Sequence, residues 1–103
     1  MRPKHLTAVI KCKRYDTTKA ALLAGDNWKE GSTFERQNRQ TFLYRTPRGT
    51  FFFAIQSGRE DEVDRIVLAT LDQAIAFWEL CKLHGTAVLE FAEAFPGVTI
   101  EEG

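Results

Sequence analysis

Every second residue from Leu6 to Cys12 is apolar, and most of the residues between them, up to Lys13, are polar. This period of two predicts a β-strand that buries one of its faces. Lys11 and Lys13 fall on the face expected to point outward. The residues expected to point inward are Leu6, Ala8, Ile10 and Cys12.

A short helix is expected after this strand. Asp16 or Thr17 can accept a hydrogen bond from a first-turn amide, which is the role of a helix N-cap. Residues from Lys19 to Ala24 favour helix, and Gly25 is suited to the position just after its end. The segment from Asp26 to Ser32 is then expected to be an irregular loop.

The clearest unit is a β-hairpin with strands at residues 34–45 and 50–57. Its connection, Thr46-Pro47-Arg48-Gly49, fits a type I turn in which Gly49 can take a positive φ. We expect Arg45 to lie opposite Thr50, and the period of two then sorts the side chains between two faces. The face expected to form the core carries Phe42, Tyr44, Phe51, Phe53 and Ile55, and the outward face carries Thr41, Leu43, Arg45, Thr50, Phe52 and Ala54.

The last part of the chain predicts a strand followed by a helix. Arg65 to Ala69 reads as a short strand, and Thr70 with Gln73 has the spacing of a capping box. The helix should run to about Leu83 and stop at Gly85. It carries one apolar stripe of Leu71, Ala74, Ile75, Trp78 and Cys81, and a second of Phe77, Leu80 and Leu83. The second stripe should be covered either by a last short helix capped by Thr86 or by a twin subunit.

These elements predict a single domain, residues 1–103, of the α+β class. Its antiparallel sheet should have three to four strands with the β-hairpin at its centre and helices packed on one face. The hydrophobic share of 44% suits a globular domain of this length. No stretch reaches the roughly 18 apolar residues that a membrane span needs, and the apolar stretch near the N-terminus is too short for a signal peptide. A cytoplasmic location is therefore expected.

The net charge of zero combines a basic half with an acidic half. Through Gly49 the chain has eleven basic and four acidic residues, and after Gly49 it has three basic and ten acidic residues. Such a separation can orient a partner or favour head-to-tail association. It can equally reflect the different surface residues of strands and helices.

Catalytic and metal-binding patterns find little support. The phosphate-binding motifs GxGxxG and GxxxxGK[ST] and the nucleophile motif GxSxG are absent. Cys81 and His84 can share a helix face as half of a zinc site, but Cys12 and His5 would have to supply the other half from opposite faces of the first strand. We therefore expect no enzymatic activity, no metal and no cofactor.

Three groups of residues, in the same order along the chain, carry a resemblance to a known family. They are Tyr15-Asp16-Thr17 with Ala20, then Leu43-Tyr44-Arg45-Thr46 with Gly49, Phe52 and Phe53, and finally Ile66, Leu68, Thr70, Ala74 and Trp78. In these the chain resembles a family of small uncharacterised bacterial proteins, many of them encoded on phages and conjugative elements. The resemblance implies a sheet-plus-helix domain of mobile-element origin and supplies no catalytic residues.

The outward sheet face is the surface expected to bind a partner. Its apolar centre would be formed by Val9, Leu43, Phe52 and Ala54, and its basic rim by Lys11, Lys13 and Arg45. Trp28 is expected either to cover this face or to anchor the contact.

Two functions remain open at this point. The leading hypothesis is a non-enzymatic interaction module that binds a protein partner, one form being a host-defence inhibitor such as an anti-CRISPR protein, with a homodimer among the expected states. The alternative is a single-stranded nucleic-acid-binding protein in which Phe52 stacks on bases beside Lys11, Lys13 and Arg45.

Overall fold

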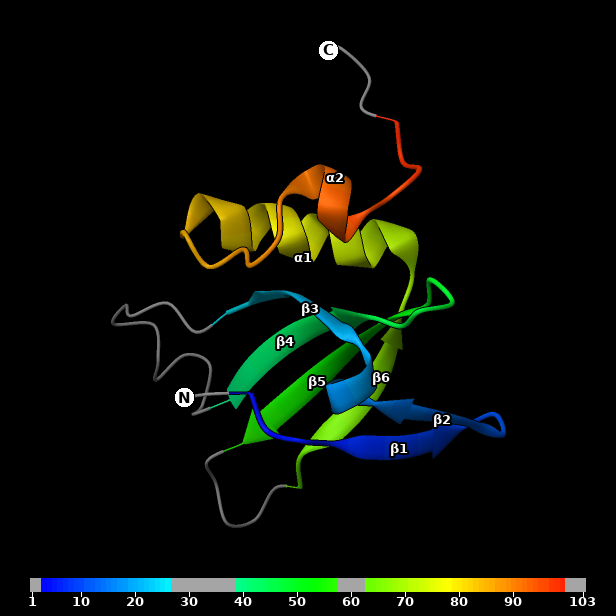
Figure 1. Cartoon of the computed structure of the whole chain (residues 1–103). Helices are drawn as coiled ribbons and strands as arrows, with labels where there is room; N and C mark the ends of the chain where they lie inside the picture. The colour runs from blue at the N-terminus through cyan, green and yellow to red at the C-terminus, as the bar shows by residue number, and fades with distance from the viewer. Residues whose placement is uncertain (1–2, 27–38, 58–62, 100–103) are drawn as a thin grey trace.

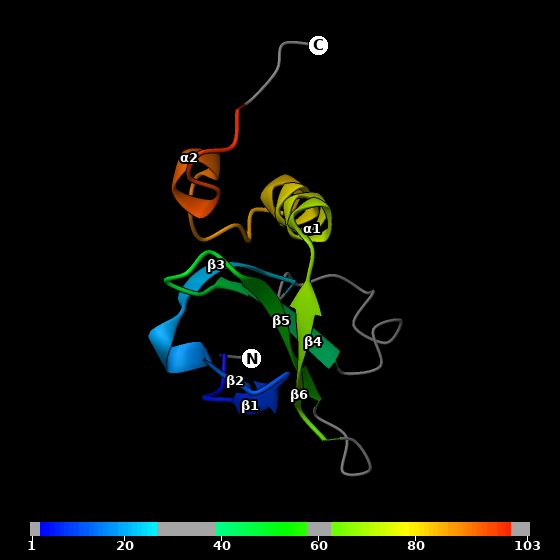
Figure 2. The ribbon, with the colours of Figure 1, turned by 90° about the vertical axis from the view of Figure 1, so that its right-hand side faces the viewer.

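The computed structural model describes residues 3–26, 39–57 and 63–99 of the 103-residue chain. At its centre is an antiparallel four-stranded sheet in the order β3-β4-β5-β6 (Figure 1). These strands are β3 (Ala21–Gly25), β4 (Arg39–Arg45), β5 (Phe51–Ser57) and β6 (Arg65–Ala69). Two helices, α1 (Leu71–Leu83) and α2 (Phe91–Ala94), lie on one face of the sheet (Figure 2). A separate hairpin of β1 (Thr7–Ile10) and β2 (Lys13–Asp16) lies on the other, and a 3₁₀ helix, η1 (Thr17–Lys19), joins it to β3. The predicted α+β class and antiparallel sheet are confirmed.

The first predicted strand is in fact a tight hairpin. Ile10 pairs with Lys13, so that Lys11 and Cys12 form a two-residue connection. Both connecting residues have positive φ, 51° and 64°, as a type I′ turn requires. The alternation holds only before this turn, where Ala8 and Ile10 are half-buried. Cys12 is exposed at the turn, so the prediction that it faces the core is wrong.

The predicted helix at residues 19–24 is also wrong. Asp16 does act as an N-cap, because its Oδ1 accepts a hydrogen bond from the Thr18 amide at 2.9 Å, but the helix that it caps is only the single turn of η1. The residues that follow form β3, which pairs with β4, and Gly25 is the last residue of that strand. Pairing in the sheet therefore outweighs the helical preference of the Ala-Leu-Leu-Ala sequence.

The central hairpin is confirmed, but its register differs from the prediction by one residue. The turn has the expected hydrogen bond, from the Gly49 amide to the Thr46 carbonyl at 2.9 Å, and Gly49 has a φ of 88°. The Thr46 amide also bonds to the Thr50 carbonyl at 2.8 Å, which makes Arg45 lie opposite Phe51 instead of Thr50. Because side chains alternate along a strand, this shift moves every residue of β5 to the opposite face.

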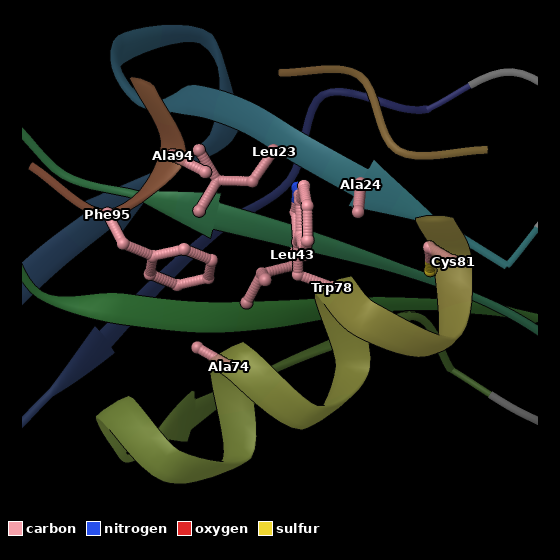
Figure 3. Packing of buried hydrophobic residues seen from close by; sticks show 8 residues of the cluster. All are labelled: Leu23, Ala24, Leu43, Ala74, Trp78, Cys81, Ala94 and Phe95. Atoms are coloured by element: carbon pink, nitrogen blue, oxygen red, sulfur yellow. The ribbon is translucent and has the colours of Figure 1, made fainter. Parts of the chain in front are cut away.

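The sheet is consequently buried on both faces. On the hairpin side, a first group packs around the fully buried Phe52: Tyr15, Phe42, Tyr44, Ala54 and Ile66. On the helix side, Leu43 and Leu23 pack against Trp78 of α1 and Phe95, as Figure 3 shows. Phe51 and Phe53, which were expected on the same face as Phe42, are half-buried on this helix side, where their rings contact Phe95 and Phe77.

The C-terminal predictions are largely confirmed. Strand β6 and helix α1 have the expected bounds, the capping box of Thr70 and Gln73 is formed, and Gly85 has a φ of 77° just after the helix. The expected last helix is shorter than predicted: it begins after Glu90, and Thr86 bonds to the Cys81 carbonyl instead of capping it. Among the described residues, no helix is long and apolar enough to cross a membrane.

The second apolar stripe of α1 is not covered by α2. The ring of Trp78, in the first stripe, contacts Phe91 at 5.5 Å between centroids, so α2 packs on the side of the first stripe. In the second stripe, Phe77 packs on the sheet, while Leu80 and Leu83 are 46% and 80% exposed. Of the two alternatives for covering this stripe, the last helix is therefore wrong, and the twin subunit stays a prediction.

Candidate functional site

The surface predicted to bind a partner does not exist as an open face. Of its apolar residues, Leu43 and Phe52 have no exposed area and belong to the two opposite cores. Ala54 is buried beside Phe52, and Val9 is exposed on the separate β1–β2 hairpin. The β1–β2 hairpin covers the face that Phe52 occupies, with the ring of Tyr15 lying 5.8 Å from the Phe52 ring in an edge-on arrangement. A base cannot stack on Phe52, and a partner cannot reach it.

Arg45, the third predicted site residue, has a structural role on the helix side. Its Nη1 donates hydrogen bonds to the carbonyl oxygens of Glu93, at 2.7 Å, and of Ala94. Cationic side chains commonly satisfy the last carbonyl groups of a helix in this way. Arg45 thus holds α2 against the sheet and is not part of a basic rim beside Lys11 and Lys13.

The other three predicted site residues are Lys11, Lys13 and Trp28. Lys11, at the hairpin turn, and Lys13, at the start of β2, are both exposed. Trp28 lies outside the described residues. Lys13 is the residue that leads to a different candidate site.

Lys13 lies on the rim of an open groove of about 450 Å³. Three segments contribute to it: strand β2, helix η1 with the residue after it, and the turn between β4 and β5. The lining residues are Lys13, Arg14, Tyr15, Asp16, Lys19, Ala20, Thr46, Pro47, Arg48 and Thr50. In Figure 2, η1 and the turn lie on the same side of the molecule. We refer to this feature as the basic groove.

Four cations surround the basic groove. Lys13, Arg14, Lys19 and Arg48 are all exposed, whereas Tyr15 is buried and Ala20 is half-buried. The charged groups therefore form the rim, and less polar side chains form the deeper wall. This arrangement of an apolar centre and a charged rim is typical of a surface that binds another macromolecule.

One wall of the groove is fixed by Thr17 and Asp16. The Thr17 hydroxyl accepts a hydrogen bond from the Leu6 amide at 3.0 Å and donates one to the Lys4 carbonyl at 3.2 Å, which ties η1 to the chain before β1. Asp16 accepts hydrogen bonds from the amide and hydroxyl of Thr18 at 2.9 and 2.7 Å. Lys13, Arg14 and Lys19 consequently project from a braced segment.

The opposite wall is the turn between β4 and β5. The Thr46 hydroxyl accepts a hydrogen bond from the Thr50 amide at 3.0 Å, in addition to the two backbone hydrogen bonds of the turn. The ring of Pro47 fixes its own φ, and Arg48 is exposed at the tip of the turn. The turn thus holds the Arg48 side chain at the mouth of the groove.

The groove also contains one carboxylate, that of Asp16. The hydrogen bonds from Thr18, together with the nearby His5 ring, lower the pKa of Asp16 from its usual value. Its Oδ1 lies 3.0 Å from Nε2 of His5. Asp16 is thus ionised at neutral pH and already partnered, so the four rim cations give the groove a net positive charge.

Metal and nucleophile chemistry has no assembled site in the part of the chain that the structure describes. No group of three or more His, Cys, Asp or Glu side chains is placed to hold a metal ion there. Burial raises the pKa of the Cys81 thiol to about 12, which keeps it protonated and unreactive.

Sequence reasoning found Lys13 but missed Arg14, Lys19 and Arg48. The only signal for them was the excess of basic residues before Gly49, since the groove exists only when the fold brings three segments together. Comparisons with known proteins add no further assignment: the chain matches no protein-family model, no curated protein and no solved structure.

Proposed function

We propose that this protein is a non-enzymatic interaction module that binds an acidic segment of a protein partner in the basic groove. The observation that carries the proposal is the convergence of Lys13, Arg14, Lys19 and Arg48 around one hollow. A rim of one charge sign attracts oppositely charged partners and orients them before contact.

A protein segment suits the groove better than a single-stranded nucleic acid. Single-strand binders stack bases on exposed aromatic rings. The aromatic residue among those that line the groove is Tyr15, which is only 7% exposed and has its ring packed against Phe52. Ala20 and Pro47 instead offer apolar contacts to a side chain that lies between acidic residues of the partner.

The proposal includes the genetic origin of the protein and its role in the cell. The resemblance of the Tyr15-Asp16-Thr17 and Leu43-Tyr44-Arg45-Thr46 stretches supports an origin on a phage or conjugative element. A small binding protein from such an element, acting in the cytoplasm, fits a role as inhibitor of a host-defence complex, as anti-CRISPR proteins are.

Fluorescence anisotropy with two labelled probes tests the binding proposal. One probe is a peptide of alternating glutamate and leucine, and the other is an oligothymidylate of equal charge. We expect the peptide to bind more tightly and its affinity to fall as salt screens the rim charges. Tighter binding of the oligothymidylate would favour the nucleic-acid alternative, and binding of neither probe would refute the proposed function.

Charge reversal locates the binding site. The double variant Arg14→Glu with Arg48→Glu should weaken peptide binding about tenfold or more, because attraction at the rim becomes repulsion. Lys82→Glu is a single-charge control away from the groove: Lys82 is exposed on α1, where its Nζ lies 3.5 Å from Glu90, and it does not line the groove. Circular dichroism should show that all variants keep the fold. Equal loss of affinity in the control and the double variant would contradict a role for the groove.

A further inference from the structure

The two edges of the central sheet differ. The outer edge of β3 is covered by residues 86–89: the Val88 and Leu89 amides donate to the Leu23 carbonyl at 2.8 and 3.2 Å, and Ala87 bridges to Ala24. Strand β6 forms the opposite edge and pairs with β5 alone. Within residues 3–26, 39–57 and 63–99, no further backbone hydrogen bond reaches β6.

The middle of β6 carries few of the features that protect an open edge. Natural proteins shorten such edges or block them with charged side chains, prolines or bulges. Strand β6 is five residues long and reads Arg-Ile-Val-Leu-Ala, so its charge, Arg65, stands at its first residue, and its pairing with β5 runs without a bulge. At its middle, Val67 is 41% exposed.

Apolar side chains extend this edge on the helix side of the sheet. Val67 lies opposite Phe53 in β5, and the Phe53 ring contacts Phe77 of α1 at 5.2 Å between centroids. Leu80 follows Phe77 by one helical turn and therefore lies on the same side of α1. Leu80 and Leu71 are both more than 40% exposed, as is Val63 just before β6. Exposed apolar side chains, those of Val63, Val67 and Leu80, thus lie near an edge that has no second strand partner among the described residues.

We propose that a second copy of this chain pairs with β6 in antiparallel fashion, about a two-fold axis at Val67. The pairing would join the two four-stranded sheets into one continuous sheet. It rests on a surface separate from the basic groove, whose lining residues lie in other segments. The groove therefore stays open on both copies.

The edge is complementary to itself in this register. Val67 faces Val67 of the second copy, Ile66 faces Leu68, and Arg65 faces Ala69, so no like charges oppose each other. Extending the pairing brings Val63 next to Leu71 of the second copy. The Arg65 side chain falls beside the first turn of the second copy's α1, which carries Asp72, and this pair is complementary in charge.

A second copy also adds to the area that the paired strands bury. Five paired residues alone contribute less than the roughly 1,200–2,000 Å² of a standard interface. The exposed side chains of Val63, Val67 and Leu80 lie at or beside the edge, and a two-fold arrangement would bury each of them twice, once from each copy.

Sedimentation velocity tests this assembly on the full chain. Between about 1 μM and about 1 mM protein, a range that spans moderately tight to weak association, the mass should rise from 11.7 kDa toward twice that value. Hydrogen exchange at the same concentrations should show added protection of β6 amides as the dimer forms. A mass of one chain throughout this range would overturn the proposal.

A matched pair of variants locates the interface. Val67→Lys should raise the dimer dissociation constant about tenfold or more, because the two-fold axis places both lysines directly opposite each other. Val88→Lys changes a valine of similar exposure at the other sheet edge and should leave the dimer intact. Val67→Thr, which suits a strand, should weaken the dimer without unfolding the chain. A dimer that persists unchanged in Val67→Lys would show that another surface forms it and would also overturn the proposal.

Discussion

The free energy that the β1–β2 hairpin gains by packing on the sheet can be measured through the contact between two aromatic rings. Tyr15 of β2 and Phe52 of β5 have ring centroids 5.8 Å apart at an interplanar angle of 64°, and the Tyr44 ring stacks on Phe52 at 5.3 Å. An aromatic pair of this kind contributes about 0.5–1.5 kcal/mol beyond the burial of its area. Phe52→Leu removes both ring contacts from a fully buried position, so it should lower the free energy of unfolding by about 1–3 kcal/mol.

A double-mutant cycle isolates the contact between the two layers. Urea unfolding, followed by circular dichroism, is measured for the wild type, Tyr15→Leu, Phe52→Leu and the double variant. The coupling energy should be about 0.5–1.5 kcal/mol, because each single change already breaks the shared ring contact.

The matched control cycle pairs Tyr15→Leu with Phe53→Leu. Phe53 lies on the helix side of the sheet, where its ring contacts Phe77, so its change should add to that of Tyr15 without coupling. A Tyr15–Phe52 coupling below about 0.3 kcal/mol, within the range of additivity, would refute the observed register and the covering of this face. Coupling only in the Phe53 cycle would instead favour the register expected from the sequence.

Three further predictions concern single features of the structure. Arg45→Met should lower the free energy of unfolding by about 1–3 kcal/mol, because its hydrogen bonds to α2 are lost. The control Arg48→Met should change this free energy by less than about 0.5 kcal/mol. Equal free energies of unfolding for the two variants in urea titrations would contradict the role of Arg45. Ellman's reagent should modify the exposed Cys12 rapidly and Cys81 only on unfolding, because burial raises the pKa of the Cys81 thiol to about 12; two fast thiols would contradict this. Lys11→Asn with Cys12→Gly should raise the free energy of unfolding by about 1–2 kcal/mol, because both residues hold a positive φ; an unchanged midpoint in thermal unfolding would refute it.

The C-terminal part of the fold could be predicted because its local signals agree with its packing. The capping box of Thr70 and Gln73 starts α1, and Gly85 follows its end in the conformation that glycine favours. Strand β6 is short and enriched in β-branched residues. Each of these signals lies within a few residues of the feature that it sets.

The N-terminal part could not be predicted from local signals. The β1–β2 turn uses Lys11 and Cys12 where type I′ turns favour Asn-Gly, so nothing in the sequence interrupts the apparent strand. Residues 21–25 are rich in alanine and leucine, which favour helix, yet their pairing with β4 makes them a strand. The structure of β3 is therefore set by a pairing distant in sequence, whereas the β1–β2 turn is local but lacks the residues that usually mark such a turn.

The one-residue difference in register has a particular cause. The predicted hairpin closes with Arg45 opposite Thr50, which leaves four residues in the connection, whereas the observed one closes with Thr46 opposite Thr50 and leaves three. A four-residue and a three-residue connection can both contain a type I turn followed by a glycine with positive φ, so the turn residues alone do not distinguish the two registers. The three consecutive phenylalanines do not distinguish them either, because alternation carries information only where one face is polar.

The run Phe51-Phe52-Phe53 is better explained by burial on both faces. A continuous apolar run is the pattern of a strand covered on both sides, and β5 is covered by α1 on one side and by the β1–β2 hairpin on the other. Once both faces are closed, a partner approaches the sheet at its edges and ends. Within the part of the chain that the structure describes, the basic groove lies beside the turn at one end of the sheet and β6 lies at one edge, and the two proposals above are built on these surfaces.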